Sequence, residues 1–401
     1  MRILWVKPGG LWPLDRGGRL RSFHTLSELS QRHQVVLLTT HAPEDDPREL
    51  RARLPWCERV VSLPHRPPKK GSLRLAGAVA ASWLSQWPVD LWKWRVPGLR
   101  AEAGRLMRTG EVDLCVADFL AAVPNLPLGG PVPVVLFEHN VEHVIWRRLA
   151  RLERRFWRRL LLALEWRKMR RCEAKACARA SITLAVSKVD RDLLASASPG
   201  AWVRDIPTGV DTSYFAPDGR RESPASLVFT GSMDWYPNED AILHFVEAIL
   251  PRVLREVPEA SLTVVGRHPS ARLRAAAAGR PVRITGGVDD VRPYVAKAGV
   301  YVVPLRVGGG TRLKIFEALA MGKAVVSTTV GAEGLPLVTG RHFLRRDDPD
   351  EFARAVVALV RDERRRESLG AAGRRLMEER HSWPQVAREF EARCKEVVRC
   401  A

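Results

Sequence analysis

The sequence predicts an α/β protein that consists of two parallel-sheet domains in tandem. Residues 2–39 contain a short apolar run, a glycine-containing loop, a helical stretch and a β-branched run, which is the repeating unit of a parallel sheet. Residues 199–218 are rich in Pro, Gly and Asp and are the best candidate for a linker. After residue 225 the same alternation starts again, and a length of 401 residues allows about two domains.

In the first half, the apolar run Arg2–Lys7 predicts a strand that ends at a Pro-Gly-Gly sequence. Arg19–Arg32 predicts a helix, because its apolar residues recur at helical spacing. The β-branched run Gln34–Thr39 predicts the second strand. Further strands, each followed by a helical stretch, are predicted at residues 112–116, 132–137 and 181–186.

In the second half, five short apolar runs predict the strands of another parallel sheet. These runs are residues 226–230, 261–265, 281–285, 300–305 and 324–328. The helices predicted between and after them are residues 240–257, 288–298, 311–320, 350–362, an Arg-rich helix to about 380, and a terminal helix from about 382.

Composition restricts the class of protein. Apolar residues make up 46% and charged residues 27%, which argues against disorder, collagen or coiled coil for the whole chain. Lys and Arg number 65 against 45 Asp and Glu, so the net charge of +20 implies an anionic ligand, lipid or nucleic acid. Six cysteines without a C-x-x-C pair argue against a zinc ribbon or redox dithiol and fit a reduced cytoplasmic setting. The apolar runs are too short for a signal peptide or a membrane span.

A glycine-rich turn follows the predicted strand 300–305. Its glycines, Gly308, Gly309 and Gly310, allow backbone N–H groups to approach a ligand, and Thr311 can cap the helix that follows. Arg312 and Lys314 then lie in the first helical turn, where the helix dipole is already positive. This concentration of positive potential predicts a phosphate or diphosphate site. The alternative is a βα turn with packing glycines and two solvated cations.

Two features of the first half also follow predicted strands. Gly17 and Gly18 lie between the first strand and the first helix, and they are predicted to line the same ligand site unless they form a plain surface loop. His139, within Glu-His-Asn at 138–140, follows the strand 132–137. It is a candidate for hydrogen bonding a hydroxyl or stabilising developing charge, and the alternative is a histidine that caps a loop.

Several motifs in this order resemble glycosyltransferase family 4, whose members are retaining, nucleotide-sugar-dependent enzymes with the GT-B fold. The resemblance covers nearly the whole chain and is closest to sugar transferases of exopolysaccharide or cell-surface assembly. The motifs that carry it are EHN at 138–140, VS at 186–187, IPTGVDTSYF at 206–215, FTGSMDWYPNEDA at 229–241, VVG at 264–266, TGGVDDVRPYVAKAGVYVVPL at 285–305 and GGGTRLKIFEALAMGKAVVST at 308–328.

The resemblance implies two Rossmann-like domains that face a central cleft, with the C-terminal helix crossing back to the N-terminal domain. We therefore expect an acceptor-binding domain at 1–205, joined by the helix 382–401, and a nucleotide-sugar-binding domain at 206–381. The implied activity is transfer of a sugar from a UDP- or GDP-type donor to an acceptor hydroxyl. The expected acceptor is a lipid-linked or cell-surface glycan precursor.

The resemblance also implies roles for individual residues. Glu317 takes the position of the second glutamate of the family's pair, which holds the ribose hydroxyls, whereas the first glutamate falls at Gly309. The Arg and Lys that family members carry after the first strand of the second domain are absent from the segment that begins at Gly231. Our interpretation is that Arg312 and Lys314 replace them.

Other expectations concern the nucleotide and the metal. Val288 begins the segment that resembles the border of the base site, and His139 is expected to assist positioning of the sugar. Asp289-Asp290 resembles a metal-binding pair, but no metal and no cofactor is expected, because cations and helix ends stabilise the leaving diphosphate in such enzymes.

The alternative functions are a degenerate transferase that only binds nucleotide, a nucleotide-sugar epimerase and a basic nucleic-acid-binding protein. We expect no nucleic-acid partner, since no recognition module is apparent.

Residues 144–179 carry 13 Arg and Lys against three Glu. Their apolar residues predict one basic amphipathic helix, which is typical of a segment that lies on an anionic membrane. We therefore expect peripheral association with the inner face of the plasma membrane. The alternative is that the apolar face packs on the domain core.

Overall fold

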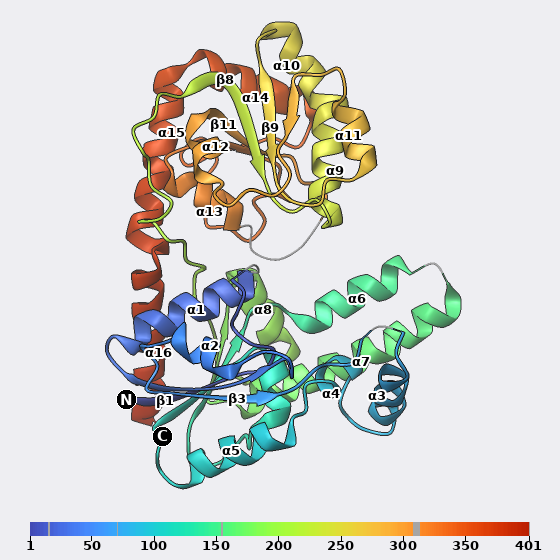
Figure 1. The fold of residues 1–401 in the computed structure, drawn as a ribbon, viewed down its shortest axis with the longest axis vertical. Helices are drawn as coiled ribbons and strands as arrows, with labels where there is room; N and C mark the ends of the chain where they lie inside the picture. The colour runs from blue at the N-terminus through green and yellow to red at the C-terminus, as the bar shows by residue number, and fades with distance from the viewer. Residues whose placement is uncertain (15–16, 70, 154, 308–312, 401) are drawn as a thin grey trace. The chain divides into compact units, whose positions relative to one another are not determined.

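The computed structural model describes residues 1–401 except 15–16, 70, 154, 308–312 and 401 (Figure 1). The chain divides into two compact units. The N-terminal unit comprises Met1–Pro207 and Val386–Ala401, and the C-terminal unit comprises Thr208–Gln385. Each unit is an α/β structure with its own parallel sheet, as the sequence predicts.

The N-terminal unit contains a seven-stranded sheet in the order β3-β2-β1-β4-β5-β6-β7, with every described pair parallel. The central strands are buried on both faces, so they read as continuous apolar runs rather than alternating ones. The strands are β1 (Arg2–Lys7), β2 (Gln34–His41), β3 (Arg59–Pro64), β4 (Leu114–Asp118), β5 (Val134–Glu138), β6 (Ile182–Ala185) and β7 (Val203–Asp205).

Helices cover both faces of this sheet. One face packs on apolar residues of α5, α7 and α8, and the opposite face carries Trp5 and Phe137. The helices are α1 (Gly17–Ser30), α2 (Pro47–Ala52), α3 (Leu73–Trp83), α4 (Val89–Trp92), α5 (Pro97–Arg108), the 3₁₀ helix η1 (Leu120–Asn125), α6 (Glu142–Leu152), α7 (Phe156–Arg179) and α8 (Lys188–Ala197).

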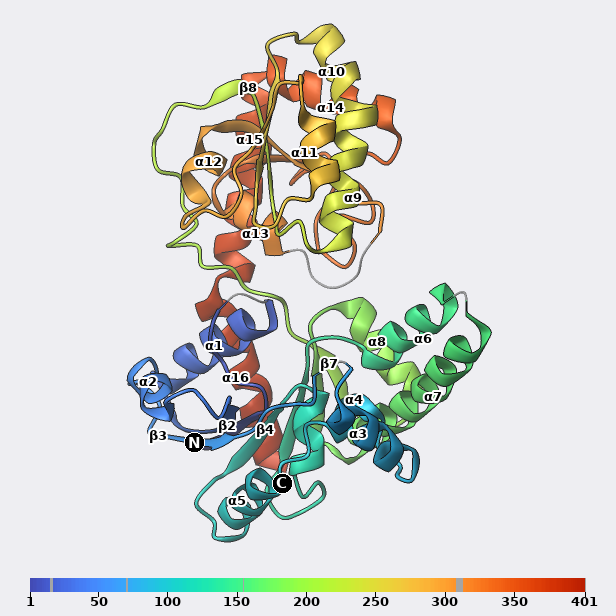
Figure 2. The ribbon, with the colours of Figure 1, turned by 45° about the vertical axis from the view of Figure 1, so that its right-hand side comes forward.

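The C-terminal unit contains a six-stranded parallel sheet in the order β10-β9-β8-β11-β12-β13. Helices flank this sheet, with α11 (Ala271–Ala277) and α12 (Arg292–Lys297) on opposite sides (Figure 2). Apolar residues of α10 and α14 pack against one face, and residues of α12 and α13 pack against the other. The strands are β8 (Ser223–Thr230), β9 (Ser261–Val265), β10 (Val282–Ile284), β11 (Ala298–Val303), β12 (Ala324–Ser327) and β13 (Leu344–Arg345).

The helix predicted at 240–257 is a continuous stretch with a π-helical turn in its middle. The turn, η2 (Phe245–Ile249), precedes Pro251, which has no N–H to continue the regular ladder. The helices are α9 (Tyr236–His244), α10 (Leu250–Glu256), α11 (Ala271–Ala277), α12 (Arg292–Lys297), α13 (Leu313–Ala320), α14 (Pro349–Arg361), α15 (Glu363–Leu376), the π-helical η3 (Met377–His381) and α16 (Trp383–Cys400).

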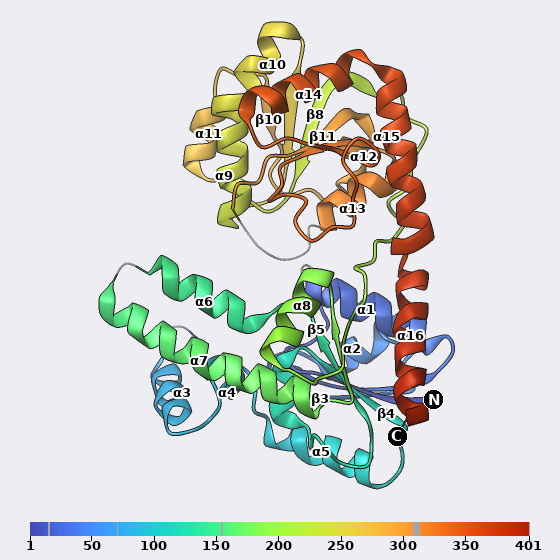
Figure 3. The ribbon, with the colours of Figure 1, turned by 180° about the vertical axis from the view of Figure 1, so that it is seen from behind.

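The terminal helix α16 returns to the N-terminal unit, which confirms that part of the predicted fold (Figure 3). Phe390 packs on Trp5 and Phe137, with ring centroids 5.6 and 5.1 Å apart. Glu391 accepts a hydrogen bond of 2.8 Å from Arg32 Nε of the loop after α1. The last residues of the chain thus complete the apolar face of the first sheet.

The prediction of one helix over 144–179 is wrong. The structure has two helices, α6 and α7, which form a hairpin that projects from the sheet (Figures 1 and 3). The helix ends because Glu153 adopts extended backbone and its carboxylate accepts the N–H of Arg155 at 2.9 Å, a local turn that competes with helical hydrogen bonding.

Candidate functional site

In the C-terminal unit, predicted site residues meet at the carboxyl end of β8. Gly231 follows this strand with a φ of +151°. A Cβ atom on Gly231 would lie 2.7 Å from both Lys314 Nζ and Asn238 Nδ2. Only glycine therefore lets the lysine cross the end of the strand without a clash.

Lys314 lies in the first turn of α13 and is held over β8. Its Nζ donates a hydrogen bond of 2.7 Å to Asn238 Oδ1 and lies 3.9 Å from the ring centroid of Phe229. The buried Asn238 is fixed in turn, because its Nδ2 donates to the carbonyl of Ser232 at 2.7 Å. The ammonium group of Lys314 thus lies beside Gly231 and Asn238, in the segment where the Arg and Lys of the family are absent.

Glu317 lies on the same helix, one turn after Lys314. Burial raises the pKa of its carboxyl to about 7, although the nearby Lys314 lowers it. Such a carboxyl can both donate and accept hydrogen bonds near neutral pH. A carboxyl with both capabilities can hydrogen-bond a pair of neighbouring hydroxyl groups, each of which can also donate or accept.

Val288, the residue predicted to border the base, is half-buried against the apolar residues that underlie α13. Close by, Asp290 forms a 2.8 Å ion pair with Arg292, whose guanidinium lies 3.7 Å from the ring centroid of Tyr214. The hydrogen bonds from Arg292 lower the pKa of Asp290. Asp290 is therefore occupied by a protein cation, and no group of three potential metal ligands exists among the residues that the structure describes.

Five predicted residues, Gly308, Gly309, Gly310, Thr311 and Arg312, lie outside the described residues. The triple-glycine anion site and the role of Arg312 therefore stay predictions.

Sequence reasoning missed two residues near the end of β8. Asn238 anchors Lys314 but lies 76 positions before it in the sequence. The sequence there shows only the start of a helix, with Pro237 in its first turn, and gives no sign of a contact with Lys314. Arg267 follows β9 and donates from Nε to Ser232 Oγ at 3.3 Å. Arg267 could have been found from the sequence, because it directly follows a Val-Val-Gly sequence at the carboxyl end of a predicted strand, where ligands bind in parallel sheets.

In the N-terminal unit, His139 lies in a buried hydrogen-bonded cluster. Its Nδ1 accepts from Arg21 at 2.9 Å, because a guanidinium group can only donate. Its Nε2 therefore carries the proton and donates to Asp118 Oδ1 at 2.8 Å. Burial lowers the pKa of His139 to about 3, so the imidazole is neutral at physiological pH.

Asp118 is the centre of this cluster. Besides His139 it accepts a hydrogen bond of 2.8 Å from Trp5 Nε1 and lies 3.2 Å from Lys7 Nζ. Burial by itself raises the pKa of Asp118, but the charge of Lys7 and the hydrogen bond from His139 hold it below its usual value. Burial lowers the pKa of Lys7, and Asp118 partly offsets this effect. Charge is thus concentrated where β1, β4 and β5 end.

The predicted glycines Gly17 and Gly18 begin α1 beside this cluster. A Cβ atom on Gly18 would lie 2.4 Å from Phe119 Cζ. Phe119 has a φ of +71° and stacks on His139 with a centroid distance of 3.8 Å. Gly18 therefore has a packing reason to be glycine, and its role toward a ligand stays a prediction.

The α6–α7 hairpin exposes apolar side chains among its many cations. Phe156 is 81% exposed, and no described helix is long and apolar enough to cross a membrane. The other large apolar residues exposed on the hairpin are Ile145, Leu149, Trp157, Leu160 and Leu164.

Two family models match different parts of the chain. Residues 17–214 match Glycosyltransferase Family 4, and residues 224–362 match Glycosyl transferases group 1. Between them they leave only the first 16 residues, a short connecting segment and the C-terminal helices unmatched.

Curated relatives and solved structures agree with these models. The chain is similar to a phosphatidyl-myo-inositol mannosyltransferase of Mycobacterium tuberculosis, with 32% identity over 206 residues, 48% of this chain and 53% of the relative. It therefore spans about half the length of the mycobacterial relatives it matches. It is also similar to an uncharacterized 44.6 kDa protein in the cps region of Klebsiella pneumoniae, with 22% identity over 89% of this chain and 90% of the relative.

Two solved structures share the fold over the whole chain. Sucrose-phosphate synthase from Thermosynechococcus elongatus has a TM-score of 0.70 at 16% identity, and each chain is covered completely. Anabaena Alr3699/HepE in complex with UDP has a TM-score of 0.63 at 14% identity, with 99% of this chain and 100% of that chain covered. The chain belongs to glycosyltransferase family 4 and has two Rossmann-like domains of the GT-B type.

Proposed function

We propose that this protein is a retaining glycosyltransferase that moves a sugar from a nucleoside-diphosphate sugar to an acceptor hydroxyl. The observation that carries the proposal is the position of Lys314, whose ammonium group is anchored by Asn238 across the carboxyl end of β8. Ligands of parallel α/β sheets bind at this end. A fixed cation beside a helix N-terminus suits a diphosphate group.

In the proposed reaction, the bond between sugar C1 and the diphosphate oxygen breaks through an oxocarbenium-like state. The acceptor oxygen forms the new bond to C1 from the same face, and its proton passes to the departing phosphate oxygen. The products are the glycoside and the nucleoside diphosphate. Lys314 stabilises the negative charge that grows on the diphosphate, together with Arg312 and the backbone N–H groups of Gly17, Gly18 and 308–311.

The rest of the donor is proposed to lie along α13 and β10. Glu317 holds the ribose hydroxyls, a role that its pKa of about 7 supports because a carboxyl can then bind as donor or acceptor. Val288 borders the base. The nucleotide is of the UDP or GDP type: a relative from Mycolicibacterium smegmatis is named as GDP-mannose-dependent, and the Anabaena structure contains UDP.

His139 is proposed to help position the donor sugar indirectly, by holding Arg21 and Phe119 in place, rather than to transfer a proton. Both of its ring nitrogens hydrogen-bond to protein side chains, and its low pKa keeps it neutral. The diphosphate charge is proposed to be met by cations and helix N-termini without a metal ion or cofactor.

The proposal is tested by product analysis. UDP- and GDP-sugars are incubated with glycan and lipid-linked acceptors, and released nucleoside diphosphate and the anomeric configuration of the product are measured. We expect release that depends on one donor, with retained configuration. The Lys314→Met variant should turn over about a hundredfold or more slowly, since it loses one preorganised charge-stabilising group. Nucleotide binding without release from any donor would instead favour the degenerate, binding-only alternative.

A second proposal is that the N-terminal unit acts at an anionic membrane surface and takes a lipid-linked acceptor there. The exposed apolar residues of the α6–α7 hairpin lie among its cations, a combination that favours the membrane interface. The neighbouring α3 adds Leu73 and Trp83, both exposed, and is joined to α7 by a 2.7 Å hydrogen bond from Lys168 Nζ to the carbonyl of Ser82.

Vesicle co-sedimentation tests this second proposal. We expect binding to anionic vesicles and little binding to neutral ones. Combined replacement of Phe156, Trp157 and Leu160 by Ser should reduce the bound fraction, whereas Val189→Ser should not, because this similarly exposed residue lies outside the hairpin on α8. Equal recovery in the supernatant with both kinds of vesicle would contradict the proposal.

A further inference from the structure

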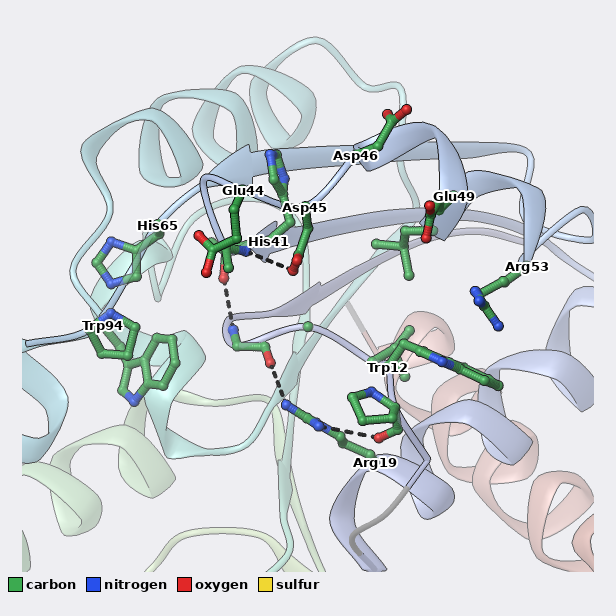
Figure 4. A pocket seen from close by; sticks show the side chains of 18 residues that line it. Trp12, Arg19, His41, Glu44, Asp45, Asp46, Glu49, Arg53, His65 and Trp94 are labelled. Carbon is green, nitrogen blue, oxygen red and sulfur yellow. Dashed lines mark hydrogen bonds between the residues drawn. The ribbon is translucent and has the colours of Figure 1, made fainter. Parts of the chain in front are cut away.

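A cavity of about 550 Å³ lies at the carboxyl ends of β1, β2 and β3 in the N-terminal unit (Figure 4). Three loop segments contribute to it: residues 9–13 after β1, residues 40–46 at the end of β2 and beyond, and residues 65–67 after β3. The rest of the lining is Arg19 of α1, Trp94, and Glu49, Leu50 and Arg53 in and just after α2. Its size suits a sugar ring or a disaccharide. All of its lining residues belong to the N-terminal unit, whereas Lys314 and Glu317 belong to the C-terminal unit.

Aromatic side chains stand on two sides of this cavity. Figure 4 shows Trp94 beside His65 on one side and Trp12 beside Arg53 on the other, with Glu44 and Asp45 between them. Gly9, at a φ of +88°, allows close approach of Trp94, because a Cβ atom there would lie 3.0 Å from the indole ring. Trp12 is 40% exposed, so part of its indole is available to a ligand. Indole faces pack well on the C–H faces of a sugar ring.

The charged residues of the cavity are mainly carboxylates. The lining contains Glu44, Asp45, Asp46 and Glu49 but only two guanidinium groups, in a chain whose net charge is +20. A carboxylate accepts hydrogen bonds from hydroxyl or ammonium groups and repels phosphate.

Both guanidinium groups interact with the protein itself. Arg19 donates to the carbonyls of Gly9 and Pro13 at 3.3 and 3.2 Å, and Arg53 lies 4.6 Å from the ring centroid of Trp12. Three of the carboxylates also have protein partners. Glu44 pairs with Arg66, and Asp46 accepts the N–H of Arg48 at 2.8 Å as the cap of α2. Asp45 accepts the N–H of Ala42 at 3.3 Å through Oδ2. Glu49 and Oδ1 of Asp45 are the carboxylate acceptors that we assign to the ligand.

We infer that this cavity binds the saccharide of the acceptor, and that this saccharide is uncharged or amine-bearing rather than phosphorylated. The inference rests on the proposed function, since it names the acceptor class of that reaction. Trp12 and Trp94 contact the ring faces, while Asp45 and Glu49 accept hydrogen bonds from its hydroxyl or ammonium groups. The acceptor chemistry therefore differs from the phosphatidylinositol in the names of the mycobacterial relatives.

Ligand-observed saturation-transfer NMR on the full chain tests the inference directly. The probes are a neutral disaccharide, chitobiose with its free amine, and glucose 6-phosphate. We expect the neutral and amine-bearing sugars to bind at least about tenfold more tightly than the phosphorylated one, because hydrogen bonds to carboxylates favour the former and repulsion disfavours the latter.

Variants locate the binding. Trp12→Ala should weaken binding of both favoured sugars, and Asp45→Asn with Glu49→Gln should remove the preference over the phosphorylated probe. Asp192→Asn is the matched control, because its exposed carboxylate lies on α8 outside the cavity. Binding of UDP or GDP should stay unchanged in all three, which also shows that the variants fold.

The outcomes separate the inference from the proposed function. Equal or tighter binding of glucose 6-phosphate, or sugar binding that survives both Trp12→Ala and the double carboxylate change, would overturn the inference. Nucleotide release that requires a phosphorylated acceptor would do the same while supporting the transferase activity. Selective sugar binding in a protein that releases no nucleotide from any donor would leave the cavity assignment standing and contradict the transferase proposal.

Discussion

The buried cluster around Asp118 makes a strong prediction about the N-terminal unit. The Asp118→Asn substitution keeps the shape of the side chain but removes its charge and places an NH₂ group where Oδ2 accepts from Trp5 and faces Lys7. Lys7 then remains buried without a counter-charge. Removing one partner of a buried ion pair costs about 3–5 kcal/mol, so we expect the free energy of unfolding of this unit to fall by that amount.

Denaturant unfolding followed by tryptophan fluorescence measures this loss, because 11 of the 13 tryptophans lie in the N-terminal unit. The pH dependence provides a second readout. Burial already lowers the pKa of Lys7, and without Asp118 it falls further. At a pH between the pKa of Lys7 in the folded variant and about 10.4, Lys7 is protonated in the unfolded chain but not in the folded one. The free energy of unfolding of the variant therefore increases with pH, and its deficit relative to wild type should shrink as the pH rises from 7 to 10.

The double variant with Lys7→Met is the control for this prediction. It removes both partners and should be more stable than Asp118→Asn alone, because no buried charge is left without a partner. A loss below about 1 kcal/mol for Asp118→Asn, or a deficit that does not change with pH, would refute the buried-charge reasoning.

Three further predictions concern packing and protonation. Gly18→Ala should destabilise the N-terminal unit by about 1–3 kcal/mol in denaturant unfolding, because its Cβ would collide with Phe119; unchanged stability would contradict that contact. Phe390→Ala should cost the same unit about 3–5 kcal/mol, and a loss confined to the C-terminal unit would count against the return of α16. The pKa of Glu317 is about 7 in the folded chain and about 4.3 in the unfolded chain, so the stability of the C-terminal unit should fall as the pH rises between these values. The Glu317→Gln variant should not show this fall. An identical pH profile in the variant would contradict the assigned burial.

Much of the fold is predictable because buried parallel strands are continuous apolar runs. β1, β2 and β11 stand out in the sequence for this reason. β3 does not, since it is half-buried at the sheet edge and its sequence Arg-Val-Val-Ser-Leu-Pro begins with a charge and ends in proline. The return of α16 follows from the family resemblance and not from any local pattern.

The candidate site is predictable only where its residues are close in sequence. Lys314 and Glu317 follow one glycine-rich turn and can be found by motif. The anchor Asn238 and the cluster partners Lys7 and Asp118 come together through sheet order, because each of the latter two is the last residue of its strand. A charged residue that ends an apolar run was a signal for both, but it becomes meaningful only when β1 and β4 are known to be neighbours.

The central claim is that Lys314 binds the diphosphate of a nucleotide sugar. Isothermal titration calorimetry of UDP and GDP, with uridine and guanosine as phosphate-free references, tests it directly. Lys297→Met is the matched control, an exposed lysine of the same unit at the end of α12. We predict that Lys314→Met weakens binding of the preferred nucleoside diphosphate by about tenfold or more, leaves the nucleoside unaffected and differs from Lys297→Met. Equal affinity of wild type and Lys314→Met for both nucleoside diphosphates would contradict the account.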